Sequence, residues 1–335
     1  MKYTKLTLLL ALLLSAVYGS YYSGEYLEMG VSARNLAMGT SCSALDKTNT
    51  AFFANPAGLA YVKNKSLNLM YMDQFGLASY NYLGTSLPVS NQSSIAFNWV
   101  RYTVTNIPRR PDLFLEGNYT LEQRKHEVLT QKGTGYGYFS NYDDALFISF
   151  AKMNYYDLFL DWMFKNLRIQ IPLGANVKIL SKNLAGQKGY GIGADIGGRI
   201  RFTFGEITSN NLGDLSFGLT LQDFTNTFVY WETKHTDLIQ PNIKTSVAFE
   251  QPFKFLNSML AFTYEQNTRF DKNPRYGIEY NLAKLLAFRA GYNFNGINYG
   301  CGLYLKIFKV HTNVNYAFLN HVLGNSHRIG LALWF

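Results

Sequence analysis

Apolar and polar residues alternate along most of the second half of the chain. In residues 167–179 every odd position is apolar, whereas the even positions include Arg168 and Lys178. In residues 192–202 the apolar side chains take the even positions, and the odd positions include Asp195, Arg199 and Arg201. A period of two residues is typical of β-strands, because successive side chains of a strand point to opposite faces. The pattern therefore predicts strands that each have an apolar and a polar face.

The alternating segments and the turn residues between them predict fourteen strands. These strands are expected to begin near Ser66, Leu77, Ser93, Asp144, Leu167, Gly189, Asp214, Pro241, Asn257, Arg275, Leu285, Gly296, Phe308 and Ser326. The long connections 103–142 and 226–240 would then lie at one end of the sheet, and the tight turns 88–91 and 282–284 at the other. Residues 154–166, which are rich in aromatic and aliphatic side chains, predict a short amphipathic helix at a membrane interface.

The composition indicates how such strands are arranged. Charged residues make up only 16% of the chain and aromatic residues also 16%, which suits a surface that meets lipid and headgroups. Backbone groups in a bilayer must be paired internally, so strands cross a membrane only as a closed barrel. A soluble β-sandwich is the alternative, but it gives no reason to keep charges on one face of so many strands. We therefore predict an all-β fold, a 14-stranded antiparallel transmembrane β-barrel formed by residues 66–335.

The first residues predict secretion. Lys2 and Lys5 precede an apolar run, Leu6–Leu14, and the small residues Val17 and Gly19 follow it. This run is too short to span a bilayer, and the pattern is that of a signal peptide over residues 1–19, cleaved before Ser20. An even-stranded barrel with such a signal is expected in the bacterial outer membrane, with both termini in the periplasm.

Residues 20–65 do not alternate and are rich in small side chains. So short a segment buries too little surface to form a core of its own. We therefore predict that it is a plug inside the lumen of the barrel. Asn55 is expected to cap a helix that begins at Pro56, because Asn is a favoured N-cap and Pro a favoured first helical residue.

The inward-facing charges of the barrel have mixed signs, which favours anchoring of the plug over an ion-selectivity filter. The candidate plug and lumen contacts are Arg34, Asp46, Asn55, Pro56, Arg168, Asp195, Arg199, Arg201, Glu279, Arg289, His311 and Arg328.

The sequence gives little support for nucleic-acid binding, catalysis, metal binding or nucleotide binding. The net charge is +9, but the basic residues are spread along the chain, so nucleic acid is not expected as a partner. No nucleophile motif accompanies the five histidines, and no residues have metal-ligand spacing, so we expect no enzyme, metal or cofactor. The glycines between Gly189 and Gly197 share the inward parity of one strand, which indicates close approach of the plug rather than a nucleotide site.

Several short motifs resemble a known family. Residues 34–39 read Arg-x-x-x-Met-Gly, residues 44–47 include Asp46, and residues 55–60 read Asn-Pro-Ala-Gly-Leu-Ala. Residues 316–318 and 323–335 are similar to a closing hairpin of the same family. In these motifs the chain resembles the PorV/PorQ family, within the wider group of FadL-like outer-membrane barrels.

The resemblance implies two functions. PorV/PorQ members are associated with type IX secretion, where the barrel holds cargo or joins the surface-attachment machinery, whereas FadL-like members pass small hydrophobic molecules through a plugged barrel. The modest length favours a non-enzymatic, secretion-associated cargo-holding or assembly barrel; the alternative is a FadL-like channel for uptake of small hydrophobic molecules. The implied partners are outer-membrane lipid, secretion-system or surface-attachment proteins, and a lipid-like ligand. For a protein-binding barrel, apolar residues on the long connection are the candidate surface: Leu113, Phe114, Leu115, Tyr119 and residues 136–139.

Overall fold

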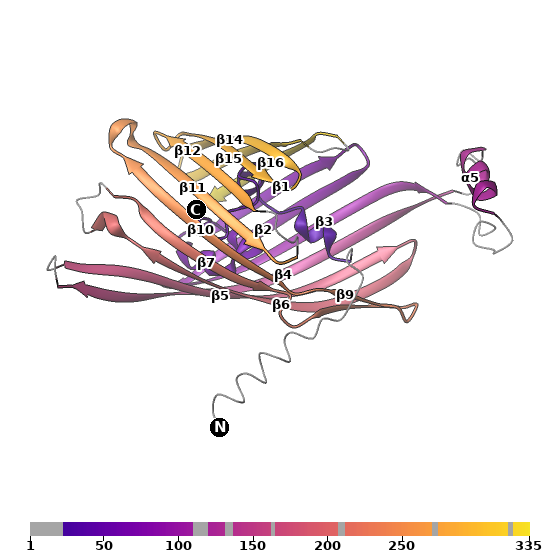
Figure 1. Cartoon of the computed structure of the whole chain (residues 1–335), viewed down its shortest axis with the longest axis horizontal. Helices are drawn as coiled ribbons and strands as arrows, with labels where there is room; N and C mark the ends of the chain where they lie inside the picture. Colours follow the sequence, from indigo (N-terminus) through magenta and orange to yellow (C-terminus); the bar gives the residue numbers. More distant parts are fainter. Residues whose placement is uncertain are drawn as a thin grey trace, which may run out of the picture.

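Antiparallel pairing joins fourteen strands into a closed ring in the computed structural model (Figure 1). The structure describes residues 23–109, 120–130, 137–161, 165–206, 212–269, 274–320 and 324–335. The predicted signal peptide, residues 1–19, lies outside these ranges. Within them, no helix is both long enough and apolar enough to span a membrane.

The ring closes through two pairings. The first strand, β1 (Ser66–Gln74), pairs with the last, β16 (Ser326–Trp334), and β5 pairs with β6. The other strands are β2 (Ala78–Ser90), β3 (Ser93–Pro108), β4 (Tyr138–Leu160), β5 (Lys165–Leu184), β6 (Gln187–Phe202), β7 (Asp214–Gln222), β10 (Asn242–Phe253), β11 (Ser258–Asn267), β12 (Arg275–Leu282), β13 (Leu286–Asn293), β14 (Gly296–Ile307) and β15 (Val310–Leu319). The predicted barrel is confirmed, and apart from β4 each strand begins close to the expected residue.

The connection 226–240, which we expected to be a loop, contains a hairpin. β8 (Thr227–Trp231) pairs with β6 beyond the point where β7 ends, and β9 (Thr236–Ile239) returns along β8. β7 and β8 are thus two parts of one strand, interrupted where Asp223 and Asn226 adopt positive φ angles. The return path is interrupted at Gln240 and Pro241, because proline has no N–H to donate to a strand ladder.

The predicted helix over residues 154–166 is wrong. β4 continues to Leu160 and β5 begins at Lys165, and cross-strand partners such as Leu158 and Leu167 lie opposite each other. Aromatic and aliphatic side chains favour a pleated strand when a partner strand is at hand. Leu167 and Ile169 pack there against Phe202 and Phe204, the latter in the short helix η3 (Phe204–Glu206). The apolar stretch therefore extends the hairpin instead of forming a helix.

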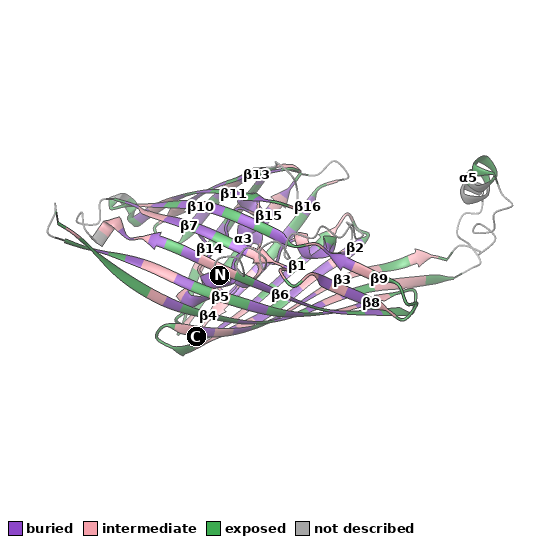
Figure 2. Ribbon diagram, turned by 60° about the horizontal axis from the view of Figure 1, so that its bottom comes forward, coloured by how far each residue is buried: buried purple, intermediate pink, exposed green. Residues whose placement is uncertain are grey.

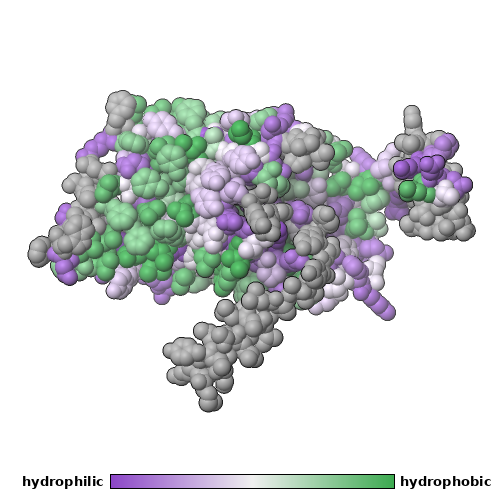
Figure 3. Space-filling model, in the orientation of Figure 1, coloured by the Kyte–Doolittle hydropathy of each residue, from purple (hydrophilic) through white to green (hydrophobic). Residues whose placement is uncertain are grey.

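The two faces of the wall differ as the alternation predicts (Figure 2). On β6, Ile196 and Ile200 are 39% and 43% exposed on the outer face, whereas Asp195, Arg199 and Arg201 are buried on the inner face. Figure 3 shows apolar residues over much of the visible wall and hydrophilic residues gathered towards the end that carries α5 (Leu121–Thr130). An apolar outer face on a closed barrel belongs in a lipid bilayer.

The two ends of the barrel carry different connections. Ser66 pairs with Trp334, so the barrel begins and finishes at the same end, which we call the terminal end. The turn between β2 and β3 and the helix η4 (Phe255–Asn257) lie at this end. The opposite end, called the loop end, carries the long connection between β3 and β4.

Residues 23–63, called the plug segment below, form four short helices. These are α2 (Glu25–Glu28), α3 (Ala33–Ala37), α4 (Ala51–Ala54) and η1 (Pro56–Tyr61). η1 contacts β3, β4, β5 and β6, whereas α3 contacts β13, β14, β15 and β16 on the other side of the ring. The segment therefore lies across the lumen. Phe52 packs against Tyr82 and Phe147 of the wall, so its contacts include apolar packing as well as polar bonds.

Candidate functional site

The strongest link between the plug segment and the wall is a buried group of three charges. Arg34 on α3 donates from Nε and Nη2 to Oε2 and Oε1 of Glu279, at 2.8 and 2.7 Å. Arg289 donates to the same carboxylate and, at 2.9 Å, to Asn315 Oδ1. Ser32 caps the start of α3, which orients Arg34 towards β12. A two-pronged arginine–carboxylate pair fixes geometry as well as charge, so this group defines where α3 sits.

A second group joins the loop after Asp46 to β6 and β10. Lys47 Nζ lies 2.8 and 2.6 Å from the two carboxylate oxygens of Glu250. Arg201 also donates to Glu250 and, at 2.5 Å, to Asp214. Burial lowers the pKa of Lys47 to about 8, although the Glu250 carboxylate opposes this shift. Lys47, which sequence reasoning missed, is thus a second basic residue that links the plug segment to a carboxylate of the wall.

Asp46 and Arg199 act through the backbone of the segment. The Asp46 carboxylate accepts hydrogen bonds from Thr48 N, Thr48 Oγ1 and Thr50 Oγ1, at 2.8 to 3.0 Å, and Arg34 Nη1 lies 3.8 Å away. Arg199 Nη2 donates to the carbonyl oxygens of Ser43 and Asp46, at 2.7 and 2.9 Å. The Asp46 carboxylate therefore fixes the conformation of the loop, and Arg199 of the wall donates hydrogen bonds to the backbone of that loop.

Asn55 and Pro56 lie against glycines of the wall. Asn55 Oδ1 accepts from Ala57 N at 3.0 Å and so caps η1, while Asn55 Nδ2 donates to the carbonyl oxygen of Gly198 at 3.0 Å. A Cβ atom at Gly197 would lie 2.2 Å from Asn55 Oδ1, and one at Gly174 would lie 2.4 Å from the carbonyl carbon of Pro56. At Gly193 the close neighbour is instead Thr227 of β8, so only part of the glycine pattern serves the plug segment.

Asp195 contacts the plug segment only indirectly. It accepts from Lys178 Nζ at 2.8 Å and from Asn176 Nδ2 at 3.2 Å, and Asn176 Nδ2 in turn donates to the carbonyl oxygen of Phe52 at 2.8 Å. Lys178 also pairs with Asp223 at the interruption of β7, and Arg269 links Asp223 to Glu28 of α2. Sequence reasoning identified neither Arg269 nor Glu28, since neither lies in a strand whose alternation would assign its side chain to the inner face.

At the loop end, Arg328 donates from Nη1 to the carbonyl oxygen of Met29. Two of the candidate residues lie elsewhere. Arg168 pairs with Asp157 at 3.0 Å, and both side chains are about half exposed. His311 is exposed at the terminal end of β15, opposite Trp334. Both side chains point to the inner face of their strands, but these strands continue past the plug segment. The alternation alone therefore wrongly predicted that both contact the plug segment.

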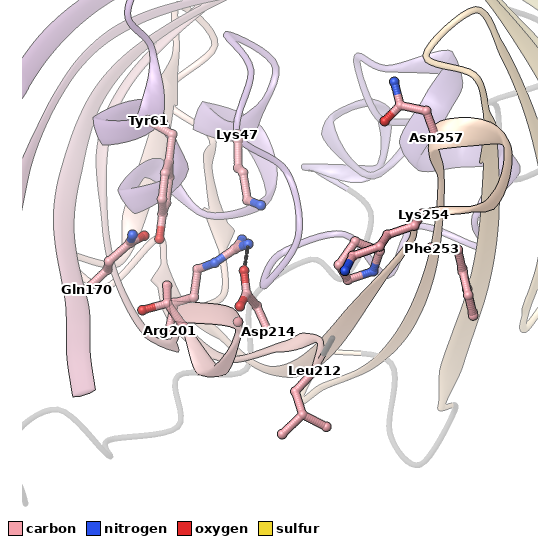
Figure 4. A pocket seen from close by; sticks show the side chains of 12 residues that line it. Lys47, Tyr61, Gln170, Arg201, Leu212, Asp214, Phe253, Lys254 and Asn257 are labelled. Atoms are coloured by element: carbon pink, nitrogen blue, oxygen red, sulfur yellow. Dashed lines mark hydrogen bonds and ion pairs between the residues drawn. The ribbon is translucent and has the colours of Figure 1, made fainter. Parts of the chain in front are cut away.

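Hollows adjoin the site in the described part of the chain. The terminal-end cavity, of about 630 Å³, is lined by Lys47 and Tyr61 from the plug segment and by Arg201, Asp214 and Lys254 from the wall (Figure 4). A loop-end cavity of about 220 Å³ lies between α2 and the ends of β12 and β16. A third hollow, of about 690 Å³, lies on the outer face over β10 to β14 and is almost wholly apolar.

No metal site accompanies these groups. Within the described ranges, no three histidine, cysteine or acidic side chains gather to hold an ion. Cys42 is buried in the plug segment and Cys301 is exposed on the outer face, and both are free thiols. The chemistry of the site is therefore that of ion pairs and hydrogen bonds between a segment and its wall.

Comparisons with known proteins give likenesses among solved structures only. No family model matches the chain, and no curated protein matches it. The chain is similar to the Ralstonia pickettii toluene transporter TbuX, with 12% identity, 91% of this chain and 97% of that chain covered, and a TM-score of 0.44. It is also similar to the Pseudomonas putida toluene transporter TodX, with 11% identity, 91% and 96% coverage and a TM-score of 0.41. These likenesses concern the fold alone, and the fold rests on the strand pairing described above.

We expect Gly291→Ala to loosen the plug segment. A Cβ atom at Gly291 would lie 2.1 Å from Gly39 N, so backbone must shift, whereas one at Gly198, on the outer parity, would meet only Leu173 at 3.4 Å. Overpacking of this kind costs about 1–3 kcal/mol. Unfolding of the two variants in denaturant, with Gly198→Ala as the matched control, measures the difference. Equal stabilities would contradict the backbone contact between Gly39 and β13.

Proposed function

We propose that the protein is an outer-membrane channel that takes up small hydrophobic molecules, with the plug segment as its movable barrier. The observation that carries this proposal is the position of the segment between two cavities. Lys47 and Tyr61 face the terminal-end cavity, whereas Glu28 and Met29 face the loop-end cavity. A barrel that served only as a rigid scaffold would have no need of a separate segment with space on both sides.

The attachment of the segment suits movement. Its charged anchors, Arg34, Lys47 and Glu28, reach three different regions of the wall, at Glu279, Glu250 and Arg269. The three ion pairs thus hold the segment at separate points of the wall and not over one continuous surface. The apolar packing of Phe52 belongs to the half of the segment near η1. η1 is followed at once along the chain by β1, whereas α2 and α3 are farther from that covalent connection, so the half that contains α2 and α3 is the better candidate for the moving part.

The outer hollow supports a hydrophobic substrate. Its walls are apolar side chains that include Phe262, Tyr276 and Tyr292, and its floor includes Gly277 and Gly291. On the inner side of these glycines lies the backbone of Met38 and Gly39, and the apolar cluster of Met38, Cys42, Ala44 and Leu45 packs beside it. Only a thin layer of wall therefore separates an apolar hollow in the membrane from apolar residues of the plug segment.

The connections support a membrane orientation. Barrels of bacterial outer membranes have short turns in the periplasm and longer loops outside. Only Asn91 and Gln92 separate β2 from β3, and only Phe308 and Lys309 separate β14 from β15, both at the terminal end. We therefore place the terminal end, with both ends of the barrel domain, in the periplasm.

The secretion-associated hypothesis stays a prediction. Its candidate surface, Leu113, Phe114, Leu115, Tyr119 and Tyr136, lies outside the described residues, while Tyr138 and Phe139 form the start of β4.

A reversible disulfide between the plug segment and the wall tests whether the segment is the barrier of the channel. Ser41 Oγ lies 2.5 Å from Thr263 Oγ1 of β11, so Ser41→Cys with Thr263→Cys in a Cys42→Ala background should form a disulfide between plug segment and wall. We expect cells that express the oxidised double variant to lose uptake of a small radiolabelled hydrocarbon, and a reductant to restore it. Each single cysteine variant is the control. Undiminished uptake by fully cross-linked protein would exclude the plug segment as the barrier.

A further inference from the structure

The walls of the terminal-end cavity hold more cations than acids. Among the described side chains, its neighbourhood contains four cationic ones, Lys47, Arg199, Arg201 and Lys254, and three acidic ones, Asp46, Asp214 and Glu250. Glu250 is shared between Lys47 and Arg201, and Asp214 pairs with Arg201. Neither Arg199 nor Lys254 pairs with a carboxylate among the residues that the structure describes. Among these described side chains, positive charges therefore outnumber negative ones by one at the mouth of a lumen.

Buried polar atoms without hydrogen-bond partners also lie at or beside the terminal-end cavity. Arg199 is 2% exposed, and its Nε and Nη1 atoms make no hydrogen bond within the described part of the chain. Its guanidinium lies 5.5 Å from the ring centroid of Tyr61, which lines the cavity. The Oε1 atom of Gln170 and the hydroxyl of Tyr61 are also buried without a hydrogen bond of good geometry. A buried polar group without a partner is costly, so such a cluster indicates that a ligand or ordered water completes it.

The rest of the lining combines apolar residues with Thr203, Gly205 and Asn257. Leu212, Pro252 and Phe253 border the cavity on the side of the turn between β10 and η4. Figure 4 shows the Lys254 amino group on the side of the cavity that faces Arg201 and Asp214. The volume of about 630 Å³ lies within the range of small-molecule sites, which combine an apolar lining with a few polar groups.

We propose that the terminal-end cavity binds a small organic oxyanion, a carboxylate or phosphate monoester with a short apolar body. The charged group faces Lys254 and the side of the cavity formed by Tyr61 and Arg201, and the apolar body lies against Pro252 and Leu212. Arg199, which is buried behind the Tyr61 ring and forms no ion pair within the described part of the chain, adds positive charge without needing to touch the ligand. This site does not depend on the channel function, since binding at the periplasmic mouth requires no movement of the plug segment.

Calorimetric titration of the full-length protein in a non-ionic detergent tests the site. The probes are hexanoate, hexyl phosphate and hexan-1-ol, which share a chain and differ in the head. We expect at least one of the two anions to bind with one-to-one stoichiometry, about tenfold or more tightly than the alcohol. The tighter anion identifies the preferred head group.

Two variants and two matched controls locate the binding. Tyr61→Phe removes a hydroxyl that makes no hydrogen bond of good geometry in the free protein, and Lys254→Gln removes an exposed charge; each should weaken anion binding about tenfold. Tyr80→Phe removes a buried, unpartnered hydroxyl outside the cavity lining, and Lys188→Gln removes an exposed lysine near the loop end; neither should change it.

Two results would overturn the site. One is equal binding of hexan-1-ol and the anions, which would show that charge plays no part. The other is anion binding that survives both Tyr61→Phe and Lys254→Gln, which would place it elsewhere. If Tyr61→Phe alters the unfolding temperature, Lys254→Gln decides alone, because Lys254 lies in an exposed turn.

Discussion

Replacing Glu279 with glutamine should free α3 from the wall. The substitution keeps the shape of the side chain but leaves Arg34 and Arg289 facing each other without their shared carboxylate. Glu279 is only 1% exposed, so water cannot easily take the place of that charge. Breaking a buried pair by removing one partner costs about 3–5 kcal/mol. We expect this cost to fall mainly on the docking of the plug segment, because the strands of the barrel are paired independently of it.

The thiol of Cys42 reports this change directly. It is 1% exposed, and the backbone N–H of Cys42 donates to Oδ1 of Asn35 in α3. In a Cys301→Ala background, a water-soluble maleimide should label Cys42 at least tenfold faster in Glu279→Gln than in the parent. Arg168→Gln is the control, since it removes an exposed ion pair worth less than about 1 kcal/mol. Labelling of Glu279→Gln at the parental rate would show that the triad does not hold the segment.

Ile196→Arg should destabilise the barrel in a membrane. Ile196 lies near the middle of β6 and is 39% exposed on the outer face. A cationic side chain at the middle of the bilayer costs a barrel about 2–4 kcal/mol, whereas the same change near an interface costs about 0–1 kcal/mol. Urea titration of the protein folded into lipid vesicles should show this loss.

Tyr190→Arg is the matched control, on the same strand and face but close to the loop end. Its stability should stay within about 1 kcal/mol of the parent. Equal losses in Ile196→Arg and Tyr190→Arg would mean that the outer face of β6 is not graded by depth in a bilayer.

The wall of the barrel was predictable because its information is local. Alternation assigned Ile196 to the outer face and Asp195 to the inner face without any knowledge of their neighbours, and the turn residues set the number of strands. Parity does not say how far a strand extends beyond the plug segment. Arg168 and His311 were misplaced for that reason, and the extension of β4 and β5 was mistaken for a helix.

The sequence predicted which kind of contact the plug segment makes with the wall, but it did not predict which wall residue each side chain contacts. Arg34 was expected to meet the wall, yet Glu279 lies 245 residues away in sequence, and nothing local selects it from the other inward carboxylates. Lys47, Glu28 and Arg269 were missed because their roles follow from how short helices stack in the lumen. The interruption of β7 at Asp223, which creates the pairing with Lys178, left no periodic signal in the sequence.

The plug segment joins β1 through a very short link. Only residues 62–65 separate η1 from the first strand. An extended chain of this length spans no more than about 18 Å. The C-terminal end of the segment therefore stays at the terminal rim, however far α2 and α3 travel. A tether this short keeps a displaced segment at a high effective concentration near its own site, about millimolar or more. If the segment moves as we propose, reclosure is an intramolecular step, whose rate does not depend on how many copies of the protein the membrane holds.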